Sequence, residues 1–199
     1  MNEQAANEQK KRVDELAASL LQIDERSIVE AAEAVANVLS TYSDTPLHIV
    51  VCGGAGSNKT TFSAALSKEL SAPAFDLDTF IPGGFTEDKW EYSNRFKKGL
   101  EKLWDEIPPV MPWIVEHVEA CNRDVVDLLH PTFAILLNPG MEHLKTVARA
   151  RDAVGEDTEG KRKRRALETG IRSRLQFQSL RGKTILRREG IEVKTLPEG

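Results

Sequence analysis

A glycine-rich stretch, HIVVCGGAGSNKTT at 48–61, carries the residues best suited to chemistry. A short apolar run precedes the glycines, and a lysine and two threonines open a helical pattern after them. The phosphate-binding template of Gly, four residues, Gly, Lys and Ser or Thr is matched at Gly53, Lys59 and Thr60. Asn58 stands where the template has its second Gly. After Gly, Asn is among the residues that best tolerate a left-handed backbone, so we predict an intact loop.

Such a loop binds a polyphosphate because its N–H groups turn inward and the next helix presents its positive N-terminal end. Lys59 would reach the terminal phosphates, and the Thr60 hydroxyl would be a Mg²⁺ ligand. The alternative is a glycine-rich strand-to-helix turn with a chance lysine, which the flanking strand and helix patterns disfavour. The predicted nucleotide-binding residues are Gly53, Gly54, Ala55, Gly56, Ser57, Asn58, Lys59, Thr60 and Thr61.

Acidic residues follow two further strand patterns. Asp76 and Asp78 end the segment at 74–78, and Glu116 ends the segment at 113–116. Ligands of open α/β sheets bind at the carboxyl ends of the strands, so these carboxylates would lie beside the glycine-rich loop. Side chains two residues apart on an extended segment point the same way, and one could accept a proton from a hydroxyl or hold Mg²⁺ through water. We predict Asp78 as the base; a polar turn after a strand is the alternative.

The elements that must position these residues alternate between strands and helices. Apolar periodicity predicts strands at 48–52, 74–78, 113–116 and 133–137, with a last strand or hairpin within 185–193. It predicts helices at 60–70, 86–107, 117–129, 141–151 and about 162–180, and two more within 8–42. This alternation favours a parallel α/β sheet with right-handed crossovers. We expect residues 1–45 to form an N-terminal helical extension for packing or dimerisation, and residues 46–199 to form one domain.

Composition narrows the classes of protein. With 199 residues, 40% hydrophobic and 29% charged, the chain can bury a substantial core. It contains no apolar run long enough to span a bilayer, and its first residues lack the apolar core of a signal peptide, so we expect a cytoplasmic protein without membrane contact. Its two cysteines, Cys52 and Cys121, form neither a disulfide framework nor a zinc-binding spacing.

The net charge of −4 hides a basic C-terminal part, because residues 161–199 hold 12 Lys and Arg against 4 Asp and Glu. Ahead of it, Arg149 and Arg151 precede the glycine-flanked polar stretch at 153–160. This pattern predicts a mobile cover over a polyphosphate, with a solvated loop and basic helix as an equal alternative. The basic run could also indicate nucleic acid, which the partly apolar helix pattern and the lack of stacking aromatics disfavour.

In the order of its motifs the chain resembles the P-loop small-molecule kinases, particularly the uridine kinase-like branch. The resemblance lies in GGAGSNKTT, DLDTF, WIVEH and FAILLNP followed by RARD, and is most specific at the first. It implies a P-loop NTPase fold: a five-stranded, mostly parallel sheet between helices. It also implies Asp78 as base or metal partner, Glu116 as the third-strand acidic residue, and Arg149, Arg151 and Asp152 at the entry to a lid around 150–165. The chain departs from the family at Asn58 and at His117, where a glycine is common; we predict His117 to be an ordinary polar residue.

We therefore expect ATP-dependent phosphorylation of a hydroxyl on a small molecule, such as a nucleoside or a sugar-like acceptor. The predicted cofactors are ATP and Mg²⁺. One alternative is a zeta-toxin-like or polynucleotide-type kinase, and another is a non-catalytic nucleotide-binding module. A third, a nucleotide hydrolase or switch, is disfavoured because the chain lacks an Asn-Lys-x-Asp motif. The predicted catalytic residues are Lys59, Asp78, Arg149 and Arg151, and the predicted metal ligands are Thr60, Asp78 and Glu116.

Overall fold

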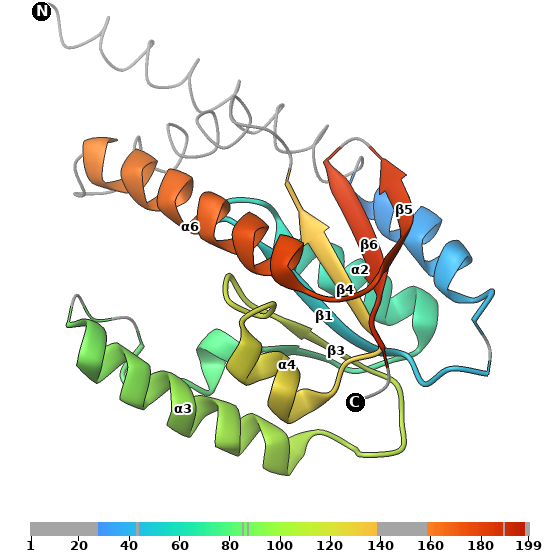
Figure 1. Cartoon of the computed structure of the whole chain (residues 1–199), viewed down its shortest axis with the longest axis horizontal. Coiled ribbons are helices and arrows are strands. Elements are labelled where there is room, and N and C mark those ends of the chain that lie inside the picture. The colour runs from blue at the N-terminus through green and yellow to red at the C-terminus, as the bar shows by residue number, and fades with distance from the viewer. Residues whose placement is uncertain are drawn as a thin grey trace, which may run out of the picture.

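The computed structural model describes residues 28–42, 44–84, 86, 88–138, 159–188 and 190–197. Its centre is a six-stranded sheet in the order β2-β3-β1-β4-β6-β5 (Figure 1). The first four strands in this order are parallel, and the last two join them as an antiparallel hairpin. The strands are β1 (His48–Gly53), β2 (Ala74–Asp76), β3 (Trp113–Glu116), β4 (Phe133–Leu137), β5 (Lys183–Arg188) and β6 (Ile191–Thr195).

The fold class is the predicted one, an α/β sheet in which the glycine-rich loop joins the central parallel strand β1 to a helix, as in P-loop NTPases. The described sheet has six strands and not the predicted five, because the C-terminal segment turns back at Gly190, with φ 73°, and forms a hairpin, one of the two arrangements predicted within 185–193.

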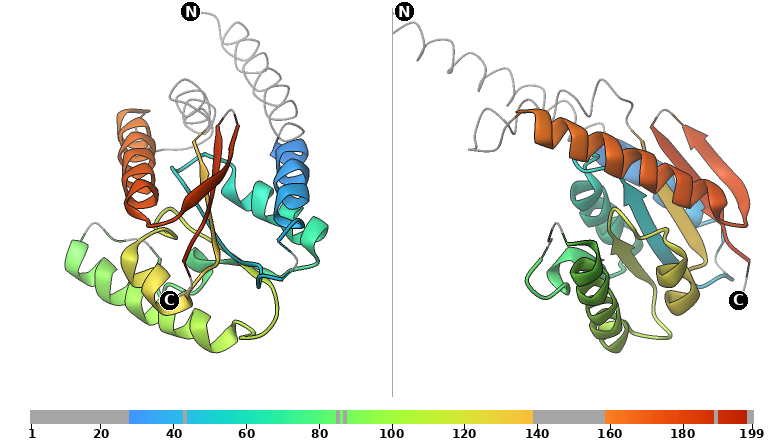
Figure 2. Two further views of the ribbon diagram at one scale, coloured as in Figure 1. Left: turned by 45° about the vertical axis from the view of Figure 1, so that its right-hand side comes forward. Right: turned by 60° about the vertical axis from the view of Figure 1, so that its left-hand side comes forward.

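Helices cover both faces of the sheet (Figure 2). One face carries a helix at 28–39 and α2 (Lys59–Leu70); the other carries α3 (Lys89–Glu106), α4 (Arg123–Leu129) and α6 (Glu159–Ser179). Along β1, Ile49 and Val51 pack into one core and Val50 and Cys52 into the other. A strand buried on both faces in this way is typical of parallel sheets, and it fixes the start of the glycine-rich loop from two sides.

Several helices and strands begin or end at other residues than predicted, and local hydrogen bonds explain most of these differences. Strand β2 ends at Asp76, where a short 3-10 helix, η1 (Leu77–Thr79), begins. Helix α3 begins after Asp88, whose side chain caps it by accepting hydrogen bonds from the N–H groups of Trp90 and Glu91. Helix α4 begins after Asn122, so the predicted helix at 117–129 is wrong over its first six residues. The predicted helix at 141–151 and the one before residue 28 lie outside the described residues.

None of the helices in the described part of the chain is long and apolar enough to cross a membrane.

Candidate active site

The glycine-rich loop follows β1 in a conformation that its residue types explain. A Cβ atom on Gly53 would lie 2.5 Å from both the Leu137 carbonyl oxygen and Ser57 Oγ, so the loop needs glycine there. Gly56 has φ 84°, and Asn58 has φ 60° and ψ 31°, both in the left-handed region. Asn58 adopts the left-handed backbone that asparagine tolerates, in agreement with the predicted intact loop. Asn58 thus reproduces the backbone of the template glycine that it replaces.

This conformation predicts opposite results for two replacements of Asn58. Glycine adopts φ 60° without strain, so Asn58→Gly should keep the loop, whereas Asn58→Ala should be less stable than Asn58→Gly by about 1 kcal/mol. Urea denaturation of the two variants beside the wild type measures the difference. Equal stability of the alanine and glycine variants would contradict it.

Lys59 begins α2 and folds back over the loop. Its Nζ donates a hydrogen bond of 3.3 Å to the Gly54 carbonyl oxygen. Burial lowers the pKa of Lys59, and the carboxylates of Glu116 and Asp78 oppose this effect. The neighbouring Ser57 hydroxyl is buried without a hydrogen-bond partner among the described residues. A half-buried cation, an unsatisfied hydroxyl and a close-packed glycine cradle together fit a polyphosphate group.

The predicted metal ligands Thr60 and Glu116 meet at the ends of α2 and β3. Thr60 Oγ1 donates a hydrogen bond of 2.6 Å to Glu116 Oε1. This bond uses the hydroxyl proton and leaves oxygen lone pairs to face a cation, and oxygen is the donor type that Mg²⁺ prefers. The described residues contain no cluster of three or more His, Cys, Asp or Glu that could hold a metal alone. The pair therefore fits a Mg²⁺ ion that takes its other ligands from phosphate and water.

Glu116 is only 4% exposed, and this burial raises the pKa of its carboxyl, an effect that the Thr60 hydrogen bond and Lys59 oppose. Between the ordinary ionisation range of glutamate, at about pH 4.3, and this raised pKa, the folded state holds a proton that the unfolded state has lost. Wild-type stability should therefore fall as pH rises through this window.

Glu116→Gln removes this titration, and its amide oxygen can still accept from Thr60. The variant should gain stability relative to wild type as pH rises through the window, measured by denaturation in EDTA. Glu101→Gln, which changes an exposed glutamate of α3, is the matched control and should show no such gain. A constant difference between Glu116→Gln and wild type across the pH range would contradict the prediction.

Asp78 and Asp76 have different environments. Asp76 caps η1, since its Oδ1 accepts a hydrogen bond from the Asp78 N–H at 2.9 Å, while Asp78 lines a cavity beside the glycine-rich loop. The strand ends at Asp76, so the argument that both side chains point the same way does not extend to Asp78.

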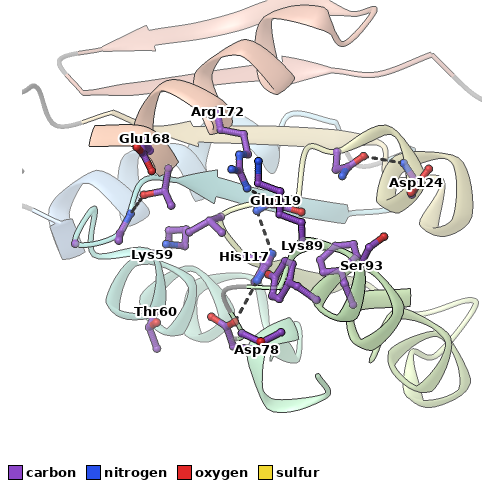
Figure 3. Close-up of a pocket in the computed structure, with 18 of the residues that line it drawn as sticks. Lys59, Thr60, Asp78, Lys89, Ser93, His117, Glu119, Asp124, Glu168 and Arg172 are labelled. Atoms are coloured by element: carbon purple, nitrogen blue, oxygen red, sulfur yellow. Dashed lines mark hydrogen bonds and ion pairs between the residues drawn. The ribbon is translucent and has the colours of Figure 1, made fainter. Parts of the chain in front are cut away.

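His117, predicted to be an ordinary polar residue, contacts Asp78 directly (Figure 3). Its Nε2 lies 3.2 Å from Asp78 Oδ1. The ring is buried within the cavity wall, next to Phe96. The signal available in the sequence was its position, because it directly follows Glu116 at the end of a predicted strand.

The cavity has a volume of about 710 Å³ and lies beside the glycine-rich loop (Figure 3). Such a volume is in the range of small-molecule sites. Its walls are formed by the glycine-rich loop and the start of α2, by η1, by α3, by the segment from β3 to α4, and by α6. The lining residues are Ala55, Gly56, Asn58, Lys59, Thr60, Thr61, Asp78, Thr86, Lys89, Tyr92, Ser93, Phe96, His117, Val118, Glu119, Asn122, Asp124, Glu168, Thr169 and Arg172.

Helix α6 contributes contacts that sequence analysis missed. Thr169 Oγ1 accepts a hydrogen bond of 2.9 Å from the Ala55 N–H of the glycine-rich loop. Arg172 Nη1 lies 2.6 Å from Glu119 Oε1 in the turn after β3. Helix α6, expected from the sequence as a basic helix with a partly apolar face, also closes one side of the cavity.

Of the predicted site residues, the structure brings Lys59, Thr60 and Asp78 together on the cavity wall, with Glu116 bonded to Thr60. Gly53, Gly54 and Ser57 form the loop behind this wall. The predicted catalytic residues Arg149 and Arg151 lie outside the described residues.

No protein-family model and no curated protein matches this chain. Among solved structures, a shikimate kinase from Bacteroides thetaiotaomicron is similar at 16% identity and a TM-score of 0.47, over 65% of this chain and 80% of that one. A gluconokinase from Sinorhizobium meliloti 1021 is similar at 16% identity and a TM-score of 0.38, over 68% of this chain and 99% of that one.

Proposed function

We propose that the protein is an ATP-dependent phosphotransferase that phosphorylates a hydroxyl group of a small molecule. One observation carries the proposal: Lys59 and Thr60 of the phosphate loop line the same cavity as Asp78. A cation and a metal-holding hydroxyl thus lie beside a carboxylate that can serve as a base. Phosphoryl transfer needs such an arrangement, because its catalysis consists mostly of positioning and charge stabilisation.

Each residue has a role that follows from its chemistry. The loop N–H groups and Lys59 would hold the β- and γ-phosphates, and Thr60 with Glu116 would hold Mg²⁺. Bound Mg²⁺ would neutralise charge on these phosphates. Asp78 would accept the proton of the acceptor hydroxyl. At the same time the hydroxyl oxygen would bond to the γ-phosphorus, and the bond between this phosphorus and the β–γ bridging oxygen would break. ADP then leaves with the electrons of that bond.

The side of the cavity formed by α3 and the start of α4 favours an acceptor with a flat or cyclic body and several hydroxyl groups. Tyr92 and Phe96 of α3 provide aromatic surface, while Ser93, Asn122 and Asp124 provide polar side chains. Ligand sites commonly combine an apolar body with a few placed polar groups of this kind. We therefore propose a nucleoside or sugar-like acceptor, at a kinase domain of residues 46–199. Arg149 and Arg151 are proposed to stabilise charge on the transferring group from a lid.

The test is ATP consumption by the purified protein with Mg²⁺ across nucleosides, sugars, sugar nucleotides and oligonucleotide ends. We expect consumption that requires one class of small-molecule acceptor and yields a phosphorylated product, identified by mass spectrometry. ATP hydrolysis that no acceptor stimulates would overturn the proposal in favour of a hydrolase. Transfer only to oligonucleotide ends would overturn the small-molecule acceptor, and ATP binding without turnover would indicate a binding module.

A further inference from the structure

On the basis of the proposed function, we infer that His117 is a positioning residue that orients the Asp78 carboxylate toward the acceptor hydroxyl. Asp78 lies in η1 and His117 directly follows β3, 39 positions further along the chain, and the two side chains meet with Nε2 3.2 Å from Oδ1. Their exposure differs sharply. The His117 side chain is 0% exposed and that of Asp78 is 70% exposed, so a buried imidazole contacts a carboxylate that is largely open to solvent.

The hydrogen bonds of the ring determine which nitrogen carries its proton. The Glu119 N–H donates to His117 Nδ1 at 3.0 Å, so Nδ1 acts as an acceptor and carries no hydrogen. The ring proton is therefore at Nε2, and Nε2 donates to Asp78 Oδ1. In this direction the buried ring donates to one carboxylate oxygen of Asp78 and restricts how the carboxylate can turn.

Both the backbone and the ring of His117 are held in place. The backbone N–H donates a hydrogen bond of 3.1 Å to the Val51 carbonyl oxygen of β1, and the Phe96 ring packs against the imidazole with 5.5 Å between the ring centroids. The turn that supplies the Glu119 N–H is itself tied to α6, because the Glu119 carboxylate pairs with Arg172. His117 thus connects the Asp78 carboxylate to the sheet, α3 and α6.

Loss of this hydrogen bond should affect the chemical step more than nucleotide binding. The phosphate loop makes no hydrogen bond to His117 among the described residues. An exposed carboxylate without this donor would occupy the productive orientation less often, and misplacement by about 1 Å can cost 10²-fold in rate.

Two amide replacements separate the functions of the two ring nitrogens. The longer side chain of His117→Gln can place its N–H₂ near the Nε2 position and donate to Asp78. The shorter His117→Asn can accept from Glu119 but does not reach Asp78. We expect His117→Asn to lower kcat by about 10- to 100-fold with KM for ATP unchanged, and His117→Gln to retain most of the rate. Both variants are first compared with wild type by urea denaturation, so that only folded protein is assayed.

The same two replacements made in an Asp78→Asn background test whether His117 acts through Asp78. A positioning residue should then have no further effect, so that His117→Asn changes the residual rate by less than about twofold. Equal rates for the Gln and Asn variants, or an undiminished loss in the Asp78→Asn background, would overturn the inference while leaving the kinase assignment intact. A raised KM for the acceptor at unchanged kcat would instead make His117 a substrate contact. A wild-type protein without acceptor-dependent turnover would overturn the proposed function, and this inference with it.

Discussion

Replacing Lys59 with alanine is expected to lower the rate of phosphoryl transfer by about 10³- to 10⁵-fold, the effect of removing a cation that stabilises the transferring group. The lysine is held over the loop by the Gly54 carbonyl oxygen and lines the cavity, so its charge faces the region where the phosphates would bind. Because Lys59 is half-buried, its charge acts more strongly than it would on a fully exposed side chain.

Single-turnover rates with saturating Mg²⁺ and ATP, beside ATP affinity measured by calorimetry, separate catalysis from binding. The matched control is Lys68→Ala, which removes an exposed lysine from the last turn of the same helix and should leave the rate unchanged. Turnover by Lys59→Ala close to that of Lys68→Ala would refute the assignment of the phosphate site.

The parts of this site that the sequence predicted well are those whose residues are neighbours in the chain. The strand, glycine-rich loop and helix at 48–70 follow from one spacing of glycines, lysine and threonine, which has few structural solutions. Even the departure at Asn58 could be anticipated, because few residues other than glycine adopt φ 60° at low cost.

Strand ends were also predictable, but the contacts made there were not. The parallel order of β1 and β3 explains why Glu116 lies near the loop, since Val51 and Glu116 are register partners. That the Thr60 hydroxyl donates to Glu116 depends on the packing of α2 against the sheet, and periodicity carries no information about it.

His117 and Arg172 were missed for the same physical reason. A histidine after a strand and an arginine in a basic helix are usually solvated side chains, and only the fold brings them to Asp78 and Glu119. The turn at 117–122 was predicted as part of a helix, because Val118, Cys121 and Val125 have helical spacing. The helix begins only after the Asn122 cap.

Replacing Asp78 with asparagine is expected to lower kcat by about 10²- to 10⁴-fold, the contribution typical of a positioned general base. ATP affinity should change little, because the amide keeps the size of the side chain and the phosphate loop is untouched.

Asp76→Asn is the informative comparison, since asparagine can still cap η1 by accepting from the Asp78 N–H. If the base is Asp78, its replacement should reduce kcat far more than that of Asp76, with product formation followed at saturating acceptor. Equal losses from both variants would mean that the two carboxylates act together, most simply through water-bound Mg²⁺, and an unchanged kcat in Asp78→Asn would require another proton acceptor on the cavity wall.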